Sequence, residues 1–398
     1  MKWWGWCLAG LAFLWLGVGK AAPAAAAAAP VEVQPEVHYT FGEQILFQAQ
    51  FVPHDKVTKV VIFYRPAWQQ AKTFFGEMTL EPDGTAFFAH NLQEAPFPAF
   101  ITLYYWFRLT LADGTIYTSP SFTFVLTDTR FHWQTMEAPP FHVFWYRGDA
   151  GFARQIADAA AAGLAQAQAL WNAPTPESVA IYAYADPQAL QSALGLESWA
   201  AGHASPRLGA LYVALPPGPQ QEAEIRRLVP HELAHYLLYH MAGDVGYRDL
   251  PAWLNEGLAS VTELSPNPDY AAALEHAAKT GDWLPLSDLC AYFPNDASGA
   301  LLAYAESASF TQYLLKRYGR ATMHTLVLTY AQGVGCQEGV VQVLGEPLPL
   351  LMRDWQRSIS PRSPLGDALG RLLPWLLLLG VVGASLLAGA WVGRKNRA

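Results

Sequence analysis

Residues 231–235 read His-Glu-Leu-Ala-His, within a stretch from 221 to 241 whose apolar residues are spaced for a helix. Side chains four residues apart on a helix project from the same face, so the imidazoles of His231 and His235 can reach one metal ion. Glu232 lies between them, beside the ion and not on it. This pattern predicts a hydrolytic metal centre carried by one helix.

A second string, Trp-Leu-Asn-Glu-Gly at residues 253–257, supplies a third ligand from a predicted helix over 251–264. A catalytic zinc site has three protein ligands, drawn from histidine nitrogens, carboxylate oxygens and thiolates, and keeps one position open for water. We therefore expect one Zn²⁺ ion held by His231, His235 and Glu256.

The chemistry expected of this centre is peptide hydrolysis. Bound zinc lowers the pKa of its water towards ~7, so Glu232 can take a proton as the water attacks a carbonyl and later pass it to the leaving amine. Two alternatives remain at this point. The zinc site can be degenerate or structural, or the pentad can be a chance match, because five-residue strings of this looseness occur in many helices.

These strings resemble the gluzincin metallopeptidases. The Trp-Leu-Asn-Glu-Gly segment is similar to that of the zinc aminopeptidases, and the whole layout resembles the bacterial peptidase MA-like family. Weaker similarities are Ala-Ala-Gly-His-Ala at residues 200–204 and Tyr-Ala-Glu-Ser at residues 304–307. The likeness covers about residues 141 to 360. It implies a zinc peptidase fold with a helical lower lobe and a cleft across the metal helix.

The resemblance also implies a hydrogen-bond donor to the oxyanion of the tetrahedral intermediate, which gluzincins take from a tyrosine or histidine on a later helix. Tyr304 is the expected donor and joins Glu232 as a predicted catalytic residue. The alternative for Tyr304 is a core position, which is common for a tyrosine in an apolar helix. His240 has a weaker claim, because it lies five residues after His235 and points away from the metal face.

Three departures qualify the resemblance. The spacing from His235 to Glu256 is longer than in the aminopeptidases. The Gly-x-Met-x-Asn string, with which those enzymes hold a substrate's free amino end, is missing, so internal cleavage is favoured over N-terminal trimming. Ser260 stands where thermolysin-like enzymes place an aspartate that orients a metal histidine, and Asn255 or Glu263 is expected to take that role.

Two folded regions are predicted. Residues 31–135 contain short runs rich in β-branched and aromatic residues between turn signals, which indicates an immunoglobulin-like or fibronectin-like β-sandwich. Residues 141–360 show a few strands and then helices, so a gluzincin-type metallopeptidase domain of the α+β class is expected. Its helices are expected at about 151–171, 186–194, 221–241, 251–264, 268–279, 300–318, 320–332 and 347–359.

One predicted strand precedes the metal helix, at residues 208–215. A strand in this position can lie along the cleft and pair with an extended peptide through backbone hydrogen bonds, with residues 209–214 as the candidate edge. A core strand is an equally good interpretation of the apolar alternation.

Both ends of the chain are apolar. Residues 1–29 predict a secretory signal peptide, with an uncleaved anchor as the alternative. Residues 372–392 are uncharged and long enough to cross a hydrocarbon core of about 30 Å as one transmembrane helix. A juxtamembrane stalk, 361–371, precedes this span, and a basic tail, 393–398, follows it. Because basic residues stay in the cytoplasm, we expect a single-pass cell-membrane protein with an extracytoplasmic ectodomain and a cytoplasmic C-terminus.

Cysteine content and charge agree with this location. Cys290 and Cys336 can form one disulfide in an oxidising compartment, although buried free thiols are an equal alternative. The formal net charge is −8 and no basic stripe occurs, so nucleic acid is not an expected partner. The sequence carries no signal for an oligomeric state.

These patterns together predict a membrane-anchored extracytoplasmic zinc peptidase that acts on peptides or proteins, with an endopeptidase favoured. One alternative is a zinc aminopeptidase. The other is a non-catalytic surface protein whose β-domain binds a partner while a structural or degenerate zinc site holds the fold.

Overall fold

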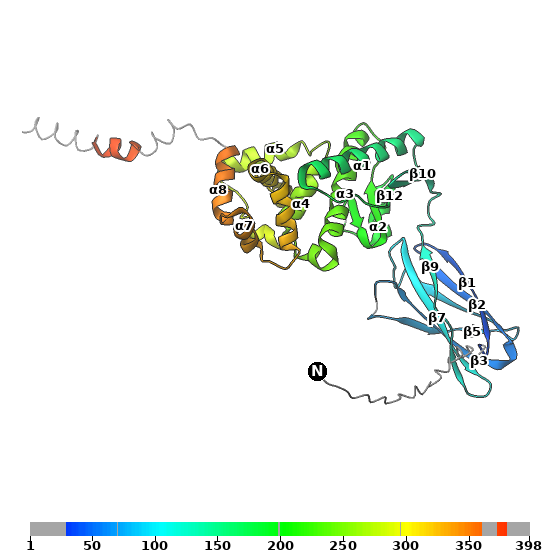
Figure 1. Ribbon diagram of the computed structural model, residues 1–398. Coiled ribbons are helices and arrows are strands. Elements are labelled where there is room, and N and C mark those ends of the chain that lie inside the picture. Colours follow the sequence, from blue (N-terminus) through cyan, green and yellow to red (C-terminus); the bar gives the residue numbers. More distant parts are fainter. Residues whose placement is uncertain (1–28, 70, 198–199, 295, 360–371, 380–398) are drawn as a thin grey trace, which may run out of the picture. The chain divides into compact units, whose positions relative to one another are not determined.

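The computed structural model describes residues 29–69, 71–197, 200–294, 296–359 and 372–379 (Figure 1). The described chain forms two compact units, each with its own core. The first contains the residues up to Ala95 together with Thr102–Val125, and the second contains Pro96–Ile101 and the residues from Leu126 onward.

The first unit is built from two β-sheets. One has the strand order β1-β2-β6-β5, and the other has the order β4-β3-β7-β8, with β9 also paired to β7. The strands are β1 Glu32–Thr40, β2 Gln44–Val52, β3 Val57–Pro66, β4 Phe74–Glu77, β5 Thr79–Leu80, β6 Thr85–Asn91, β7 Ile101–Leu111, β8 Ile116–Thr118 and β9 Phe122–Leu126, with a short 3-10 helix, η1, at His54–Lys56.

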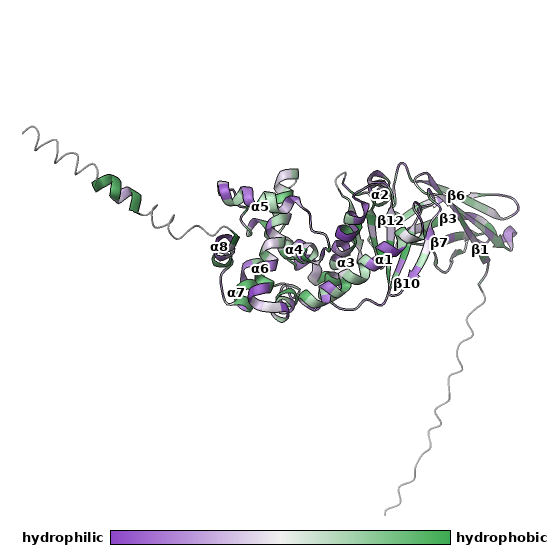
Figure 2. Cartoon of the chain, turned by 90° about the horizontal axis from the view of Figure 1, so that it is seen from above, coloured by the Kyte–Doolittle hydropathy of each residue, from purple (hydrophilic) through white to green (hydrophobic). Residues whose placement is uncertain are grey.

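Alternating apolar residues of these strands fill the space between the two sheets. Phe47 of β2 packs against Tyr64 of β3 and Tyr105 of β7, with ring centroids 5.0 and 5.4 Å apart. The period of two along each strand sends one face inward and the other to solvent, and Figure 2 shows the mixture of hydrophobic and hydrophilic residues that results. The predicted N-terminal β-sheet region is confirmed, while its immunoglobulin-like or fibronectin-like class stays a prediction.

The second unit contains a five-stranded sheet in the order β10-β11-β12-β14-β13. β11, β12 and β14 run parallel, and β10 and β13 are antiparallel to their neighbours. The strands are β10 Gln134–Ala138, β11 Phe141–Trp145, β12 Val179–Tyr184, β13 Gly202–Ser205 and β14 Ala210–Ala214.

For residues 209–214 the candidate substrate-binding edge is wrong, and the alternative of a core strand is confirmed. β14 lies between β12 and β13, so both of its backbone edges are already used, and all five of its residues are buried. A strand that is buried on both faces has a nearly continuous apolar sequence. Such a sequence does not show whether the strand lies at the edge or in the middle of the sheet. The edge strand beside the metal helix is β13, which has too few apolar residues to be noticed.

Between residues 150 and 359 this unit also contains eight α-helices, which confirms the α+β class. They are α1 Ala150–Trp171, α2 Pro187–Leu194, α3 Gln221–Gly246, α4 Ala252–Thr262, α5 Asp269–Thr280, α6 Ala297–Tyr330, α7 Cys336–Leu344 and α8 Leu348–Ile359, with short 3-10 helices η2 Pro206–Leu208, η3 Tyr247–Asp249 and η4 Asp288–Cys290. α1 and α3 pack against each other and against the sheet, and α4 packs between α3 and α6. α7 was not predicted from the sequence.

Two glycines break helices that the backbone otherwise continues. Gly319, with φ of 78°, divides α6 at the point where the sequence predicts one helix ending at 318 and the next starting at 320. Gly243, with φ of 77°, interrupts α3 just after its predicted end. Glycine takes these left-handed angles without the steric cost that a Cβ atom brings.

Close helix contacts explain two further glycines. A Cβ atom added at Gly163 of α1 would lie 2.7 Å from the Cβ atom of Pro230 in α3. A Cβ atom added at Gly257 of α4 would lie 2.1 Å from the hydroxyl oxygen of Thr311 in α6. The glycine of the Trp-Leu-Asn-Glu-Gly string is therefore required by the approach of α4 to α6, which brings Glu256 and Tyr304 to one cavity.

The division between the units differs in detail from the predicted boundary. Residue 135, the predicted end of the β-sandwich, falls inside β10, which pairs with β11 of the second unit. Residues 96–101 also group with the second unit, where the ring of Phe100 packs 4.0 Å from that of Tyr182.

The predicted signal peptide, stalk and basic tail lie outside the described residues, apart from residue 29. The predicted membrane span at 372–392 is described from 372 to 379, where it is helical and mainly hydrophobic (Figure 2). Within the described ranges, no helix is both long enough and apolar enough to cross a membrane.

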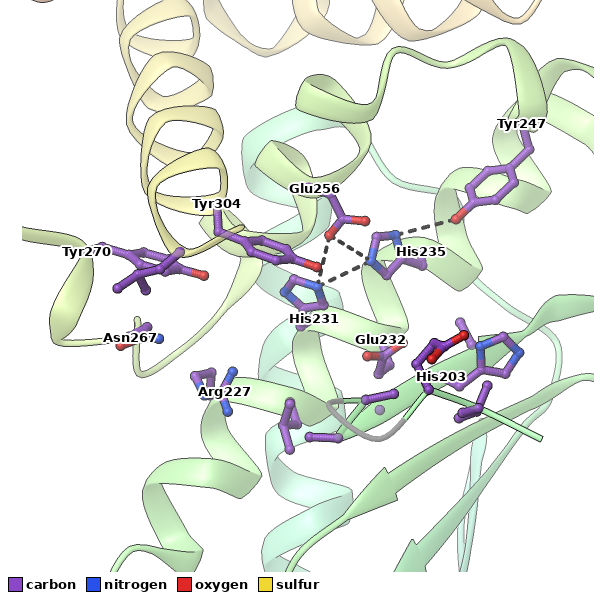
Figure 3. A pocket seen from close by; sticks show the side chains of 18 residues that line it. His203, Arg227, His231, Glu232, His235, Tyr247, Glu256, Asn267, Tyr270 and Tyr304 are labelled. Carbon is purple, nitrogen blue, oxygen red and sulfur yellow. Dashed lines mark hydrogen bonds and ion pairs between the residues drawn. The ribbon is translucent and has the colours of Figure 1, made fainter. Parts of the chain in front are cut away.

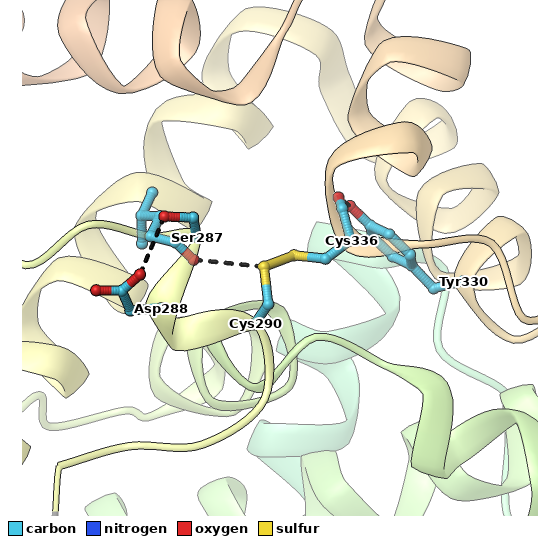
Figure 4. Close-up of a disulfide and its surroundings, with 6 residues drawn as sticks. Ser287, Asp288, Cys290, Tyr330 and Cys336 are labelled. Atoms are coloured by element: carbon cyan, nitrogen blue, oxygen red, sulfur yellow. Dashed lines mark hydrogen bonds between the residues drawn. A yellow bond between two sulfur atoms is a disulfide. The ribbon is translucent and has the colours of Figure 1, made fainter.

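Cys290 and Cys336 form a disulfide (Figure 4). It links η4 to the first residue of α7, and the carbonyl oxygen of Cys336 accepts a hydrogen bond from the hydroxyl of Tyr330 at 2.6 Å. This confirms the disulfide over the alternative of free thiols.

Candidate metal centre

α3 and α4 bring the three predicted ligands together (Figure 3). The Nε2 atoms of His231 and His235 lie 3.2 Å apart, and Oε2 of Glu256 lies 3.4 Å from each of them. A single cation can contact all three atoms, because one donor atom of each residue lies within 4.8 Å of the others. The histidines meet because they are four apart on α3, and Glu256 joins them because α4 packs against that helix.

Each histidine is oriented through its other ring nitrogen. Nδ1 of His231 lies 2.9 Å from Oε1 of Glu263, and Nδ1 of His235 lies 3.1 Å from Oδ1 of Asn255. A carboxylate can only accept a hydrogen bond, so Nδ1 of His231 donates and its Nε2 lone pair points into the cavity. Acceptors of this kind fix the tautomer and orientation of a metal-binding imidazole. The two residues proposed as alternatives for this role each contact a different histidine.

This donor set fits a divalent metal ion. Oε2 of Glu256 is buried at a distance too long for a good hydrogen bond from either imidazole, and no other described group donates to it. Burial lowers the pKa of His231, but Glu256 and Glu263 outweigh this and raise it, so these carboxylates favour a positive charge here, which a metal ion bound to the neutral imidazole would supply. Two imidazole nitrogens and one carboxylate oxygen are ligands that zinc prefers.

Glu232 lies beside these ligands and against the edge strand. A Cβ atom added at Gly202 of β13 would lie 2.3 Å from Oε1 of Glu232, so only glycine leaves room for this carboxyl group. Burial raises the pKa of Glu232, and the two neighbouring histidines counteract part of that rise. A carboxyl group whose proton affinity is raised, and that lies next to the metal ligands, is suited to accept and return a proton.

Tyr304 of α6 lies in the same cavity, which has a volume of about 590 Å³. Its ring centroid is 6.3 Å from that of His231, and Phe293 packs edge-on against it at 4.9 Å. Burial raises the pKa of Tyr304, and the charges of Glu256 and Glu232 add to the effect, so its hydroxyl remains protonated and able to donate.

Several cavity residues were not predicted from the sequence. The hydroxyl of Tyr247 in η3 lies 3.4 Å from Nδ1 of His235 and accepts a hydrogen bond from Asn255 at 3.2 Å. No motif marks Tyr247. Arg227 could have been predicted from helical spacing, because it lies four residues before His231 and so projects from the same face of α3. Asn267 and Tyr270 also line the cavity and were not predicted, and His203 lies there as part of the string at residues 200–204, to which no role was assigned.

Pro230 inside α3 links the metal helix to the segment that follows α4. Proline has no N–H group, so the carbonyl of Arg226, four residues earlier, lacks its usual helical donor. The backbone N–H of Leu264 donates to that carbonyl at 2.9 Å. Leu264 directly follows Glu263, so this hydrogen bond anchors the backbone that presents the carboxylate to His231.

A family model described as the Peptidase MA superfamily matches residues 159–361, half of the chain. The chain belongs to the Peptidase MA superfamily. The match includes α3 and α4 with all three candidate metal ligands, and it supports a metallopeptidase-type function. Superfamily members are typically zinc-dependent, which agrees with the His-His-Glu donor set.

Other comparisons are more distant. No curated protein matches the sequence significantly. Among solved structures, an aminopeptidase N family protein from Idiomarina loihiensis is 7% identical, with 81% of this Peptidase MA chain and 76% of that chain covered at a TM-score of 0.38. A structure titled as a myokine is 9% identical, with 23% of this chain and 92% of that chain covered at a TM-score of 0.20.

Proposed function

We propose that this protein is a zinc-dependent endopeptidase, anchored by its C-terminal segment in the cell membrane with its peptidase unit outside the cytoplasm. The observation that carries the proposal is the single cavity in which two imidazoles and a carboxylate converge beside a buried, non-ligating glutamate. His231, His235 and Glu256 would hold the zinc ion. When bound, zinc would acidify a water molecule and polarise the substrate carbonyl.

The chain's own residues supply the proton transfers and the oxyanion contact. Glu232 takes a proton from the attacking water and returns it to the leaving amine, which is the usual division of work for a general base beside a metal. Tyr304 donates a hydrogen bond from its neutral hydroxyl to the developing oxyanion. A well-placed donor of this kind contributes about 3 kcal/mol to catalysis.

Cleavage within a peptide is favoured by the position of β13. Its residues Gly202, His203 and Ala204 line the cavity, and among the described strands it pairs with β14 alone. Its other edge can pair with an extended peptide through backbone hydrogen bonds, which reads the direction of the substrate and not its terminus. The missing Gly-x-Met-x-Asn string supports the same choice.

The location outside the cytoplasm is supported by the disulfide and by the sequence of the chain ends. Cytosolic thiols are kept reduced, whereas a structural disulfide persists in secreted and surface proteins. The apolar stretch at 372–392 with the basic tail after it would place the C-terminus in the cytoplasm.

The test is the cleavage of a proteome-derived peptide mixture by the full-length protein loaded with zinc, with and without a chelator. Wild type is expected to give clustered internal cuts that the chelator abolishes. Glu232→Gln is expected to lower kcat by roughly 10²- to 10⁴-fold while zinc content and Tm stay unchanged, because Glu232 is not a ligand.

Other outcomes have distinct meanings. Removal of single N-terminal residues would replace the endopeptidase with an aminopeptidase. Full activity in Glu232→Gln, or no chelator-sensitive cleavage by a zinc-loaded wild type, would contradict the proposed mechanism.

A further inference from the structure

One lobe of the metal cavity carries polar groups that peptide hydrolysis itself does not require. Figure 3 shows Arg227, Asn267 and Tyr270 on the same side of His231, and all of them line the cavity. They come from α3, from the loop before α5 and from α5 itself. A guanidinium, an amide and a phenol are all hydrogen-bond donors, so this lobe is suited to an anionic, oxygen-rich group.

Arg227 is held next to the metal centre by helix geometry. It lies four residues before His231, so both side chains project from the same face of α3. Its side chain is 25% exposed, and it reaches the cavity, whereas the neighbouring Arg226 is exposed and does not line it. The two arginines therefore carry the same charge in adjacent positions of one helix, with different access to substrate.

The guanidinium has donors left for a ligand. Glu224 accepts a hydrogen bond from one NH2 group of Arg227 at 2.5 Å, and it does so from outside the cavity. A guanidinium has five N–H donors. Among the described residues, only Glu224 accepts from Arg227, and it does so through this NH2 group. Burial raises the pKa of Tyr270 and the charge of Glu263 raises it further, while a hydrogen bond with Ser260 and the charge of Arg227 lower it.

Among the described residues that line the cavity, Arg227 is the only lysine or arginine, and Glu232 and Glu256 lie on the metal side. The protein as a whole carries a formal charge of −8, so its overall field does not attract acidic peptides. Glu197 also lines the cavity, but it is exposed and its charge is screened by water. An arginine fork binds a carboxylate through two parallel hydrogen bonds, which a neutral amide cannot reproduce.

We propose that Arg227, with Asn267 and Tyr270, forms a subsite that binds a carboxylate group of the peptide substrate beside the scissile bond. This inference rests on the proposed peptidase function and names its substrate class. The carboxylate comes from an aspartate or glutamate side chain or from the C-terminus of the peptide, and the two sources share the same recognition chemistry.

The experiment uses a peptide that the zinc-loaded full-length protein cleaves. Each position flanking the cut is replaced in turn by Glu, Gln or Lys, and every peptide is made with a free and with an amidated C-terminus. At one position Glu is expected to exceed Gln about tenfold in kcat/KM, the lower end for a hydrogen bond to a charged group. A preference confined to free C-termini would identify the terminal carboxylate as the ligand.

Three variants give the controls. Arg227→Gln is expected to remove the preference mainly by raising KM, because the contact exists in both the bound substrate and the transition state. Arg227→Lys is expected to restore part of it. Arg226→Gln changes the net charge by the same amount outside the cavity and is expected to keep the full preference.

A second measurement separates this inference from the proposed function. The proteome-derived peptide mixture is applied to immobilised Glu232→Gln protein, and the Asp and Glu content of the retained peptides is compared with that retained by Glu232→Gln combined with Arg227→Gln. Enrichment of acidic peptides that depends on Arg227 supports the subsite even if wild type cleaves nothing. Equal retention by the two proteins, or cleavage by wild type without a carboxylate preference, would overturn it.

Discussion

Glu306 is a buried carboxyl group two residues after Tyr304 on α6. Its side chain is fully inaccessible, Oε1 accepts a hydrogen bond from the backbone N–H of Leu284 at 3.0 Å, and Oε2 has no partner among the described residues. Burial raises the pKa of Glu306 to about 7, although the hydrogen bond from Leu284 counteracts it. The carboxyl group is therefore held neutral below that pH and charged at high cost above it.

The stability of the fold should consequently fall as pH rises through 7. The folded pKa is higher than the unfolded value of 4.5, so the contribution of Glu306 is fully present below about pH 4.5 and is lost as the group ionises. Between pH 5 and 8 the loss amounts to roughly 2–3 kcal/mol. Glu306→Gln cannot ionise and should lack this loss, so its free energy of unfolding relative to wild type should rise by that amount over the same range.

Urea denaturation of the zinc-loaded proteins at pH 5 and pH 8 measures this difference. Glu275→Gln is the matched control, because Glu275 is exposed and pairs with Lys279 on the surface of α5. A difference between Glu306→Gln and wild type that is independent of pH would show that Glu306 ionises normally.

At the residue scale, the sequence predicts the parts of the site that follow a helical period. His231, His235 and Glu232 are fixed by spacing on α3 alone. Asn255 and Glu263 were predicted only as alternatives for orienting one histidine, because the sequence does not show which ring each side chain reaches, and in the structure each contacts a different one. Tyr247 and Tyr270 reach the cavity through tertiary packing, which cannot be predicted from the residues next to them in the sequence.

At the element scale, Pro230 should affect metal binding without contacting the metal. Pro230→Ala supplies an N–H group that competes with Leu264 for the carbonyl of Arg226, so the backbone presenting Glu263 loses its anchor. We expect the zinc affinity to fall about threefold to tenfold, less than the 10- to 100-fold typical of removing an orienting partner outright. The helix itself should not be weakened, because proline is unfavourable in a helix interior.

Competition with a chelator measures zinc affinity, and thermal melting of the metal-free protein measures the fold. Glu263→Gln is the reference variant and should show the larger loss of affinity. If Pro230→Ala bound zinc as tightly as wild type while Glu263→Gln did not, the hydrogen bond from Leu264 would have no positioning role.

The limits of prediction at this scale are set by sheets more than by helices. α1, α3, α4 and α6 have long apolar periods, and the break at Gly319 was marked by the glycine itself. β13 is four residues long and has no apolar alternation, so it was not predicted, and the strand that became β14 was left open between an edge and a core position. The order of strands within a sheet depends on pairing between segments that are distant in the sequence. The apolar periodicity along one strand does not show which other strands it pairs with.

At the scale of the whole molecule, the second unit is closed by a covalent link. The disulfide joins Cys290 and Cys336 across a sequence separation of 46, and the enclosed segment contains all of α6 with Tyr304. A cross-link over a loop of this length stabilises the folded state by about 4 kcal/mol in the chain-entropy model, because it restricts the unfolded chain. Spacing alone left the pairing open, since it does not show that η4 and α7 meet.

Loss of this disulfide should lower stability while leaving the metal centre in place. Cys290→Ser combined with Cys336→Ser is expected to unfold at lower urea concentration, with a decrease of up to about 4 kcal/mol in the free energy of unfolding. Its zinc content should equal that of wild type, because α3 and α4 carry all three ligands and both lie before Cys290. Reductant should destabilise wild type to the level of the double variant and leave the variant unchanged. A wild-type unfolding curve that ignores reductant would mean that the two cysteines do not hold this unit together.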